Sequence, residues 1–155
     1  MTGQLSTSTC RPGPQAEVPD FHTLDISELY VRVIVSRHSA RNAEFVFDRE
    51  PWCHIKIGHV EVKPDAFLKF NKQEQYFIEV DRASGDRTKL AKKLRQYVNL
   101  YEAWDVDVDG ETFPQVFCSV PNDDRRRVIH SVIKHQRYPS LFRVALFNEI
   151  VERLT

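Results

Sequence analysis

The stretch from Val62 to Asp81, VKPDAFLKFNKQEQYFIEVD, contains two short apolar runs separated by a polar pentapeptide. The runs DAFLKF and YFIEVD have the length and composition of β-strands, and NKQEQ has the length of a hairpin connection. We therefore expect an antiparallel hairpin here. Its unusual feature is that three carboxylates, those of Asp65, Glu79 and Asp81, lie in or beside its strands.

The faces of this hairpin follow from the alternation of side chains along a strand. Closing the NKQEQ loop symmetrically predicts that Asp65 lies opposite Asp81. The same register places Glu79 opposite Phe67, and a shift by two residues leaves the faces unchanged. All three carboxylates are then expected on one side, within about 4.5–8 Å of one another.

Two interpretations of the three carboxylates are open. Like charges at this spacing destabilise a sheet unless something compensates them. A hard divalent cation, Mg²⁺ or Mn²⁺, would do so because it prefers carboxylate oxygens. Alternatively, the carboxylates form a solvated acidic face, and their spacing favours neither interpretation. An arginine that clamps one carboxylate and leaves no room for an ion would argue against the metal.

Composition limits the class of protein more than its function. The 155 residues, 41% hydrophobic and 28% charged, are typical of one soluble domain, and the 22 basic residues balance the 22 acidic ones. The three cysteines have no zinc-ligand spacing, and the five glycines form no phosphate-binding loop. No apolar run approaches the roughly 20 residues of a membrane span. We expect a cytoplasmic protein with no membrane partner.

The order of the expected elements predicts an α/β fold. Residues 1–20, rich in Ser, Thr, Gly and Pro, are expected to form a disordered leader, and residues 21–155 one domain. A capping-box pattern of Asp25 and Glu28 predicts the start of the first helix. Besides the hairpin, strands are expected at 43–48, 55–62, 115–120 and 141–147, helices at 89–104, 122–136 and 148–154, and an acidic loop at 105–114. This order favours a central mixed sheet with an antiparallel meander, flanked by helices.

The hairpin also resembles known families. The dipeptide PD, followed by a hairpin and Glu-x-acid, resembles the PD-(D/E)xK nuclease superfamily. VKPDAFLKF, YFIEVDRASGD and KLAKKLRQYVNLY are similar, more narrowly, to the replication-relaxation family of plasmids and actinobacteria. The likeness covers roughly residues 24–147 and is most distinctive at 63–101. It implies a restriction-endonuclease-like fold and a role in plasmid replication and DNA relaxation.

The resemblance also implies roles for single residues. In the superfamily, the Asp of PD and the Glu of the next strand hold a metal, and a lysine two residues further on helps to activate water. Asp65 and Glu79 match the first two positions, but Asp81 stands where the lysine is usual. Some members take the lysine from the next helix, where Lys93 is our choice. Asp81 is then a third metal ligand or orients a metal-bound water, and Glu28 corresponds to the superfamily's helical glutamate.

The helix after the hairpin is the expected DNA-binding surface, because its basic residues directly follow the acidic hairpin. The alternative is that this run of charges is simply a solvated helix face. The expected contacts are Lys89, Lys92, Arg95 and Tyr97. A second basic run, Arg125–Arg127, is more simply a solvated helix face, since Asp123 and Asp124 precede it and partly neutralise it.

These features predict a DNA-acting domain that cleaves phosphodiester bonds as a Mg- or Mn-dependent endonuclease or nickase. The alternative is a catalytically inactive nuclease-fold module that binds DNA or docks proteins in plasmid replication or mobile-element maintenance. Asp81 in the usual lysine position favours this alternative. A third interpretation is an interaction domain with no DNA role. Family members often carry an N-terminal winged-helix region, which we do not expect here. A protein partner would then supply DNA targeting, and a homodimer stays open.

Overall fold

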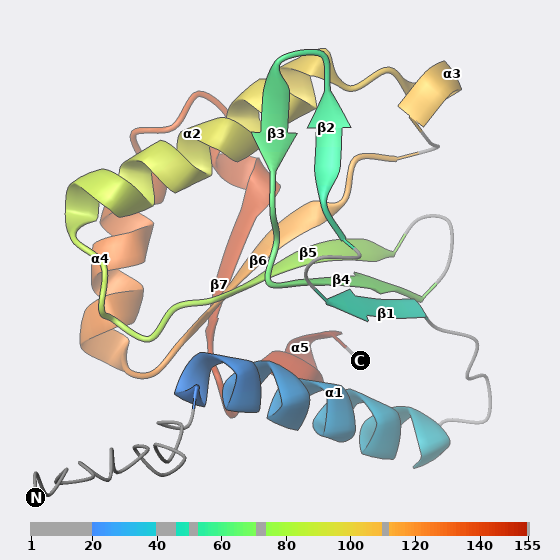
Figure 1. The fold of residues 1–155 in the computed structure, drawn as a ribbon. Helices are drawn as coiled ribbons and strands as arrows, with labels where there is room; N and C mark the ends of the chain where they lie inside the picture. Colours follow the sequence, from blue (N-terminus) through green and yellow to red (C-terminus); the bar gives the residue numbers. More distant parts are fainter. Residues whose placement is uncertain (1–19, 40–45, 50–52, 71–73, 110–111, 155) are drawn as a thin grey trace, which may run out of the picture.

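The protein is an α/β domain built on a five-stranded mixed sheet (Figure 1). The computed structural model describes residues 20–39, 46–49, 53–70, 74–109 and 112–154, so the leader expected at 1–20 lies, except for its last residue, outside the described residues. The elements are α1 (Phe21–Ser39), β1 (Val46–Arg49), β2 (Ile55–Ile57), β3 (Val60–Val62), β4 (Ala66–Lys69), β5 (Gln75–Val80), α2 (Arg87–Ala103), α3 (Val106–Asp109), β6 (Gln115–Val120), α4 (Asp123–Ile133), the 3₁₀ helix η1 (Pro139–Leu141), β7 (Phe142–Leu146) and α5 (Ile150–Leu154).

Strand β5 is the point at which the sheet changes direction. The strand order is β1-β4-β5-β6-β7, with antiparallel pairs from β1 to β5 and parallel pairs from β5 to β7. Parallel neighbours require crossover connections, and α2 and α4 provide them. Strand β6 lies between two parallel neighbours and is buried almost throughout, as its apolar sequence QVFCSV predicts. The predicted α/β fold with a mixed sheet between helices is confirmed.

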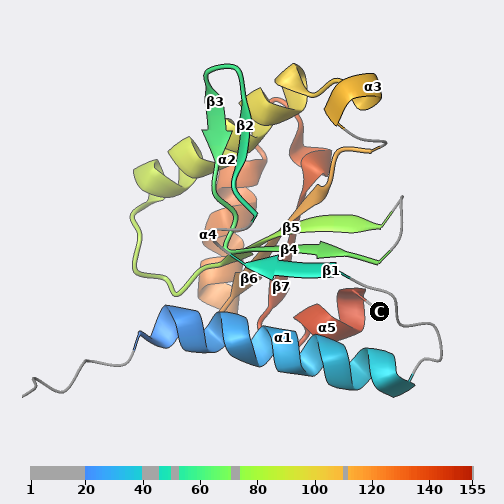
Figure 2. The ribbon, with the colours of Figure 1, turned by 45° about the vertical axis from the view of Figure 1, so that its right-hand side comes forward.

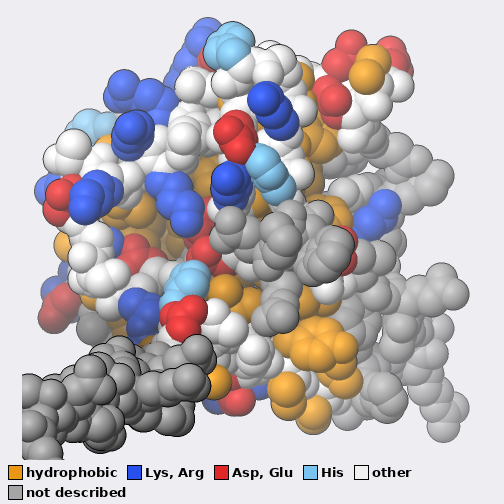
Figure 3. Space-filling view, viewed as in Figure 1, with side chains coloured by type: hydrophobic (Ala, Val, Ile, Leu, Met, Phe, Trp, Pro, Cys, Tyr) orange, Lys and Arg blue, Asp and Glu red, His pale blue; other side chains and the backbone are white. Residues whose placement is uncertain are grey.

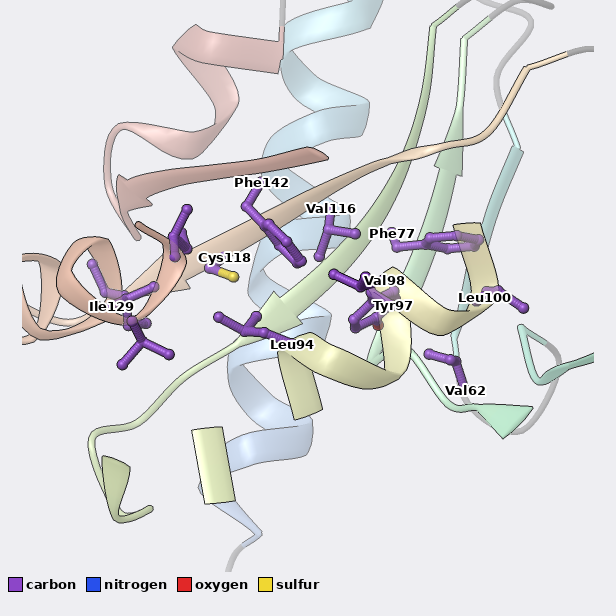
Figure 4. Close-up of a cluster of buried hydrophobic side chains, with 13 residues drawn as sticks. Val62, Phe77, Leu94, Tyr97, Val98, Leu100, Val116, Cys118, Ile129 and Phe142 are labelled. Atoms are coloured by element: carbon purple, nitrogen blue, oxygen red, sulfur yellow. The ribbon is translucent and has the colours of Figure 1, made fainter. Parts of the chain in front are cut away.

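Helices cover both faces of the sheet. Helices α2 and α4 lie on one face, and α1 and α5 lie on the other (Figures 1 and 2). Figure 4 shows the core on the first face, where residues of α2 pack against β5, β6 and β7. We call these the α2 face and the α1 face. Because side chains alternate along β5, Phe77 belongs to the α2 face and Ile78 to the α1 face.

The register of the central hairpin differs from the expected one by two residues. Phe67 pairs with Phe77, and Ala66 pairs with Ile78. The loop closes between Phe70 and Glu74, whose backbone N–H and carbonyl groups are 2.9 Å apart. The faces are unchanged, but the shift places Asp65 beside Glu79 rather than opposite Asp81, so the expected pairing was wrong.

Strands β2 and β3 do not join the main sheet as the expected meander implied. They form a separate two-stranded ribbon, reversed at Gly58, which has a φ of +58° that glycine adopts without strain. The apolar side chains of the ribbon, Ile55, Ile57, Val60 and Val62, pack on the α2 face. The ribbon therefore extends the wall of the domain beside α2 (Figure 2).

Two local predictions were also wrong. Helix α1 begins at Phe21, four residues before the expected Asp25, because Asp20 accepts a hydrogen bond from the backbone N–H of His22. Asp25 instead pairs with Arg82 in the loop after β5. The expected acidic loop contains the short helix α3. Among the described residues, no helix is both long and apolar enough to cross a membrane.

Candidate functional site at the end of β5

Two of the three predicted carboxylates lie side by side where β4 begins and β5 ends. The backbone N–H of Asp65 donates to the carbonyl of Ile78 at 3.0 Å, and the N–H of Val80 donates to Asp65 Oδ2 at 2.7 Å. These bonds place Asp65 beside Glu79. Both residues are buried, with exposed fractions of 8% and 6%. The hairpin therefore holds two carboxylates in a place with little water.

Basic and polar groups from both layers of helices face this pair. Lys93, in the second turn of α2, forms an ion pair with Glu79 Oε2, and Tyr97, one turn later, donates a hydrogen bond to Glu79 Oε1. His22 Nε2 of α1 lies 3.1 Å from Asp65 Oδ1. Each carboxylate thus has a partner supplied by a different face of the sheet.

The protonation of the site follows from burial and neighbouring charge. Burial raises the pKa of Glu79 to about 8, and the nearby Asp65 charge acts in the same direction, while Lys93 and Tyr97 oppose it. Burial by itself would lower the pKa of Lys93, but the Glu79 and Asp65 carboxylates raise it. Lys93 is therefore a stable cation. Burial and Glu79 raise the pKa of Tyr97, so its hydroxyl stays a neutral donor.

The third carboxylate, Asp81, is held by an arginine. Arg125 Nε lies 3.0 Å from Asp81 Oδ1, and Arg125 Nη2 lies 2.8 Å from Oδ2. Oδ1 also accepts the backbone N–H of Ala83 at 2.6 Å. Arg125 is placed by the start of α4, where the side chain of Asn122 accepts its backbone N–H. In the described part of the chain, no three His, Cys, Asp or Glu side chains form a group that could hold a metal ion. The structure thus brings Asp65 and Glu79 together and holds Asp81 in an arginine clamp, the arrangement that argues against a metal ion bound by all three carboxylates.

A cavity of about 260 Å³ opens at the end of β5. Its lining includes Glu79, Asp81, Lys93 and His22, so α1, α2 and the end of β5 all contribute to it. The cavity brings acidic and basic side chains to one hollow that a small polar group can enter.

The other predicted site residues occupy different positions. Lys89, Lys92 and Arg95 are exposed on α2, as a DNA contact requires. Tyr97 was predicted to contact DNA but is fully buried, because its ring packs against Phe77 and its hydroxyl binds Glu79. This corrects the prediction: its ring is not available to a nucleic acid.

Three residues outside the predicted DNA contacts also differ from expectation. Glu28 is exposed and pairs with Arg32 along α1 at 2.8 Å, not with the carboxylate pair. Sequence reasoning missed His22 altogether. It assigned Arg125 to a solvated surface, and the local sequence around the capping Asn122 gives no signal of its pairing with Asp81.

The fold and these side chains define a mixed α/β domain with a buried carboxylate pair and a lysine facing it from the following helix. A family model described as replication-relaxation matches residues 8–116, and the chain belongs to the replication-relaxation family. This match spans Asp65, Glu79 and Lys93 and connects the chain with DNA replication and relaxation. No curated protein and no solved structure matches it.

Proposed function

We propose that this chain acts on DNA as a divalent-metal-dependent phosphodiesterase, an endonuclease or nickase of the PD-(D/E)xK type with a restriction-endonuclease-like fold. One observation carries the proposal: Asp65 and Glu79 lie together at the end of the central hairpin, and Lys93 reaches Glu79 from the next helix. Two acidic side chains and one lysine are the groups that the superfamily uses, and the cavity beside them is open to a substrate phosphate.

The carboxylate pair fits Mg²⁺ or Mn²⁺. These ions prefer hard oxygen ligands, and Mg²⁺ in proteins commonly keeps several waters and uses only one or two carboxylates. Asp65 and Glu79 would supply those oxygens, and Glu79 would release on metal binding the proton that its pKa of about 8 lets it keep at neutral pH. Asp65 and Glu79 also have partners, and a bound ion would have to displace His22 from Asp65 and Lys93 from Glu79.

Asp81 is left out of this ligand set because a single arginine, Arg125, binds both of its oxygens. We assign Asp81 a supporting role, in which it holds the turn that leads to the capped start of α2.

The reaction then depends on charge. A bound ion would polarise the phosphate and lower the pKa of a water molecule. Lys93, which is cationic, would turn from Glu79 towards the phosphate and stabilise the negative charge that grows during attack. Tyr97 would keep Glu79 oriented through its hydrogen bond to Oε1. Burial of the pair excludes bulk water and strengthens each of these interactions.

Nicking of supercoiled plasmid DNA in the presence of Mg²⁺ or Mn²⁺ tests the proposal. We expect Asp65→Asn, Glu79→Gln and Lys93→Met each to lower the nicking rate by about a hundredfold or more, because each removes a group that stabilises the transition state. Glu28→Gln, which removes an exposed carboxylate, is the matched control and should leave the rate unchanged. Mn²⁺ should raise the melting temperature of the wild type but not of Asp65→Asn. A chain that cleaves with no metal ion, or a Glu79→Gln variant as active as the wild type, would refute the proposal.

A second candidate function is a DNA-binding or protein-docking module that has lost cleavage. A specific observation favours it: each carboxylate of the site has a basic partner within the chain, His22 for Asp65, Lys93 for Glu79 and Arg125 for Asp81. Salt-sensitive DNA binding without nicking under either metal would select this function over the first.

A further inference from the structure

The β2–β3 ribbon and α2 flank a second, open cavity, which we call the ribbon groove. It has a volume of about 620 Å³ and is lined mainly by Lys63 and Glu61 of the ribbon and by Lys89, Lys92, Lys93 and Gln96 of α2. The ribbon keeps its position because its apolar side chains pack on the α2 face. The groove therefore has one wall of strand and one wall of helix, and Figure 2 shows the ribbon beside α2.

Two of the four lysines that line the ribbon groove are uncompensated in the described part of the chain. Glu61 is the acidic residue in the lining, and it is shared by His54 at 2.5 Å and Lys63 at 3.5 Å. Lys89 and Lys92 are exposed, and neither has an acidic partner among the described residues. Figure 3 shows Lys and Arg side chains gathered over the part of the molecule where α2 and the ribbon lie. Such a groove attracts a polyanion.

We infer that the ribbon groove binds the backbone of a single strand of DNA and leads it to the carboxylate pair. This inference rests on the proposed function and adds the form of the substrate to it. Lysine ammonium groups contact phosphate oxygens as point charges and do not read the identity of the bases, so the binding is independent of DNA sequence. The groove is open to solvent and lies between a ribbon and a helix, and its volume of about 620 Å³ suits the backbone of one strand rather than the width of a duplex.

Lys93 connects the ribbon groove with the catalytic cavity. It lines both, and its ammonium group touches Glu79. Lys89 lies one turn before Lys93 on α2, so phosphates held along the helix lead towards the buried carboxylates. A strand in the groove thus presents its next phosphate at Lys93.

Fluorescence anisotropy with a labelled single-stranded oligonucleotide of mixed sequence, without metal, tests the groove separately from cleavage. The variant is Lys89→Gln/Lys92→Gln, and Lys134→Gln, at the end of α4 outside the groove, is the matched control. Contacts from Lys63, Lys89 and Lys92 predict that the logarithm of the binding constant falls with that of the salt concentration with a slope of about −2. The double variant should bind about tenfold or more weakly, with a slope smaller by roughly 1.4.

The outcomes of this experiment separate the two proposals. The groove is confirmed if the double variant loses affinity for the single strand while Lys134→Gln does not. It is overturned if both variants bind like the wild type, or if the double variant loses as much affinity for the matching duplex as for the single strand. The binding assay contains no metal, so its result does not depend on cleavage. A failure to nick plasmid DNA in the separate assay with Mg²⁺ or Mn²⁺ would refute the phosphodiesterase and leave the binding result standing. Circular dichroism of each variant checks that α2 is intact.

Discussion

The two faces of the sheet are packed by different chemistry. On the α1 face, the core is an apolar cluster of Ile26, Leu29, Val33, Ala66, Leu68, Ile78, Val80, Phe117, Ala145 and Ile150, and the buried polar side chain beside it is the uncharged Ser119. The α2 face has an apolar core too, but Glu79, Lys93 and the Tyr97 hydroxyl meet beside it. The difference teaches that one face supplies stability at little electrostatic cost, while the other holds charges that water would otherwise stabilise.

A single strand divides these two roles. Along β5, Ile78 and Val80 enter the α1 core, whereas Phe77 enters the α2 core and Glu79 enters the site. Adjacent residues of a strand point to opposite faces, so chemistry and packing are separated by one residue. Substitutions on the two faces should therefore differ in both size and pH dependence.

The largest expected effect is on the apolar face. Phe117→Ala removes a side chain that is 1% exposed, and we expect the free energy of unfolding to fall by about 3–5 kcal/mol because a cavity remains. Urea denaturation at about pH 5 and pH 8 should give the same loss at both values. A loss that changed strongly with pH would show that this face is coupled to the charges on the other.

The next effect comes from Glu79, whose pKa of about 8 in the fold exceeds its ordinary value of 4.5. Between these values the folded state binds more protons than the unfolded state, so stability falls as the pH rises from about 4.5 to 8. Each pKa unit corresponds to about 1.4 kcal/mol. We therefore expect the free energy of unfolding of Glu79→Gln, relative to that of the wild type, to rise by about 3 kcal/mol between pH 5 and pH 8. Urea denaturation of the two proteins across this range measures it. Parallel stability curves would contradict the raised pKa.

The smallest effect concerns the arginine that holds Asp81. Arg125→Met leaves Asp81 without its partner, and because the pair is only partly buried we expect a loss of about 2 kcal/mol in the free energy of unfolding. Arg127→Met, at a side chain 78% exposed, is the matched control, with a change within about 0.5 kcal/mol. Adding Asp81→Asn to Arg125→Met should restore part of the loss. If the two arginine variants have equal melting temperatures, the clamp contributes nothing to stability.

Local sequence pattern predicted most elements because their signals lie within single segments. The continuous apolar run QVFCSV matches β6 residue for residue. The hairpin register could not be predicted, since a shift by two residues leaves every side chain on the same face. The start of α1 was ambiguous because Asp20 and Asp25 both suit a helix cap; in the fold Asp20 accepts the backbone N–H of His22, and Asp25 pairs with the distant Arg82.

The candidate site was predictable only in part. Asp65 and Glu79 share a hairpin, so alternation along two strands placed them on one face. Arg125 is 44 residues from Asp81, and their contact depends on how α4 packs over the end of β5. No periodic pattern carries that information. Lys93 entered through the family resemblance, because the sequence around it is an ordinary amphipathic helix.

The hydrogen bond from the Val80 N–H to the Asp65 carboxylate has a consequence for how the domain folds. Its partners are only 15 residues apart, so it can form as soon as the hairpin closes, before the parallel strands β6 and β7 are added through their long crossovers. The carboxylate pair of Asp65 and Glu79 would then be brought together early in folding, when the β4–β5 hairpin forms. Folding-rate measurements on Asp65→Asn and Asp65→Ala, interpreted through φ-values, would time this event.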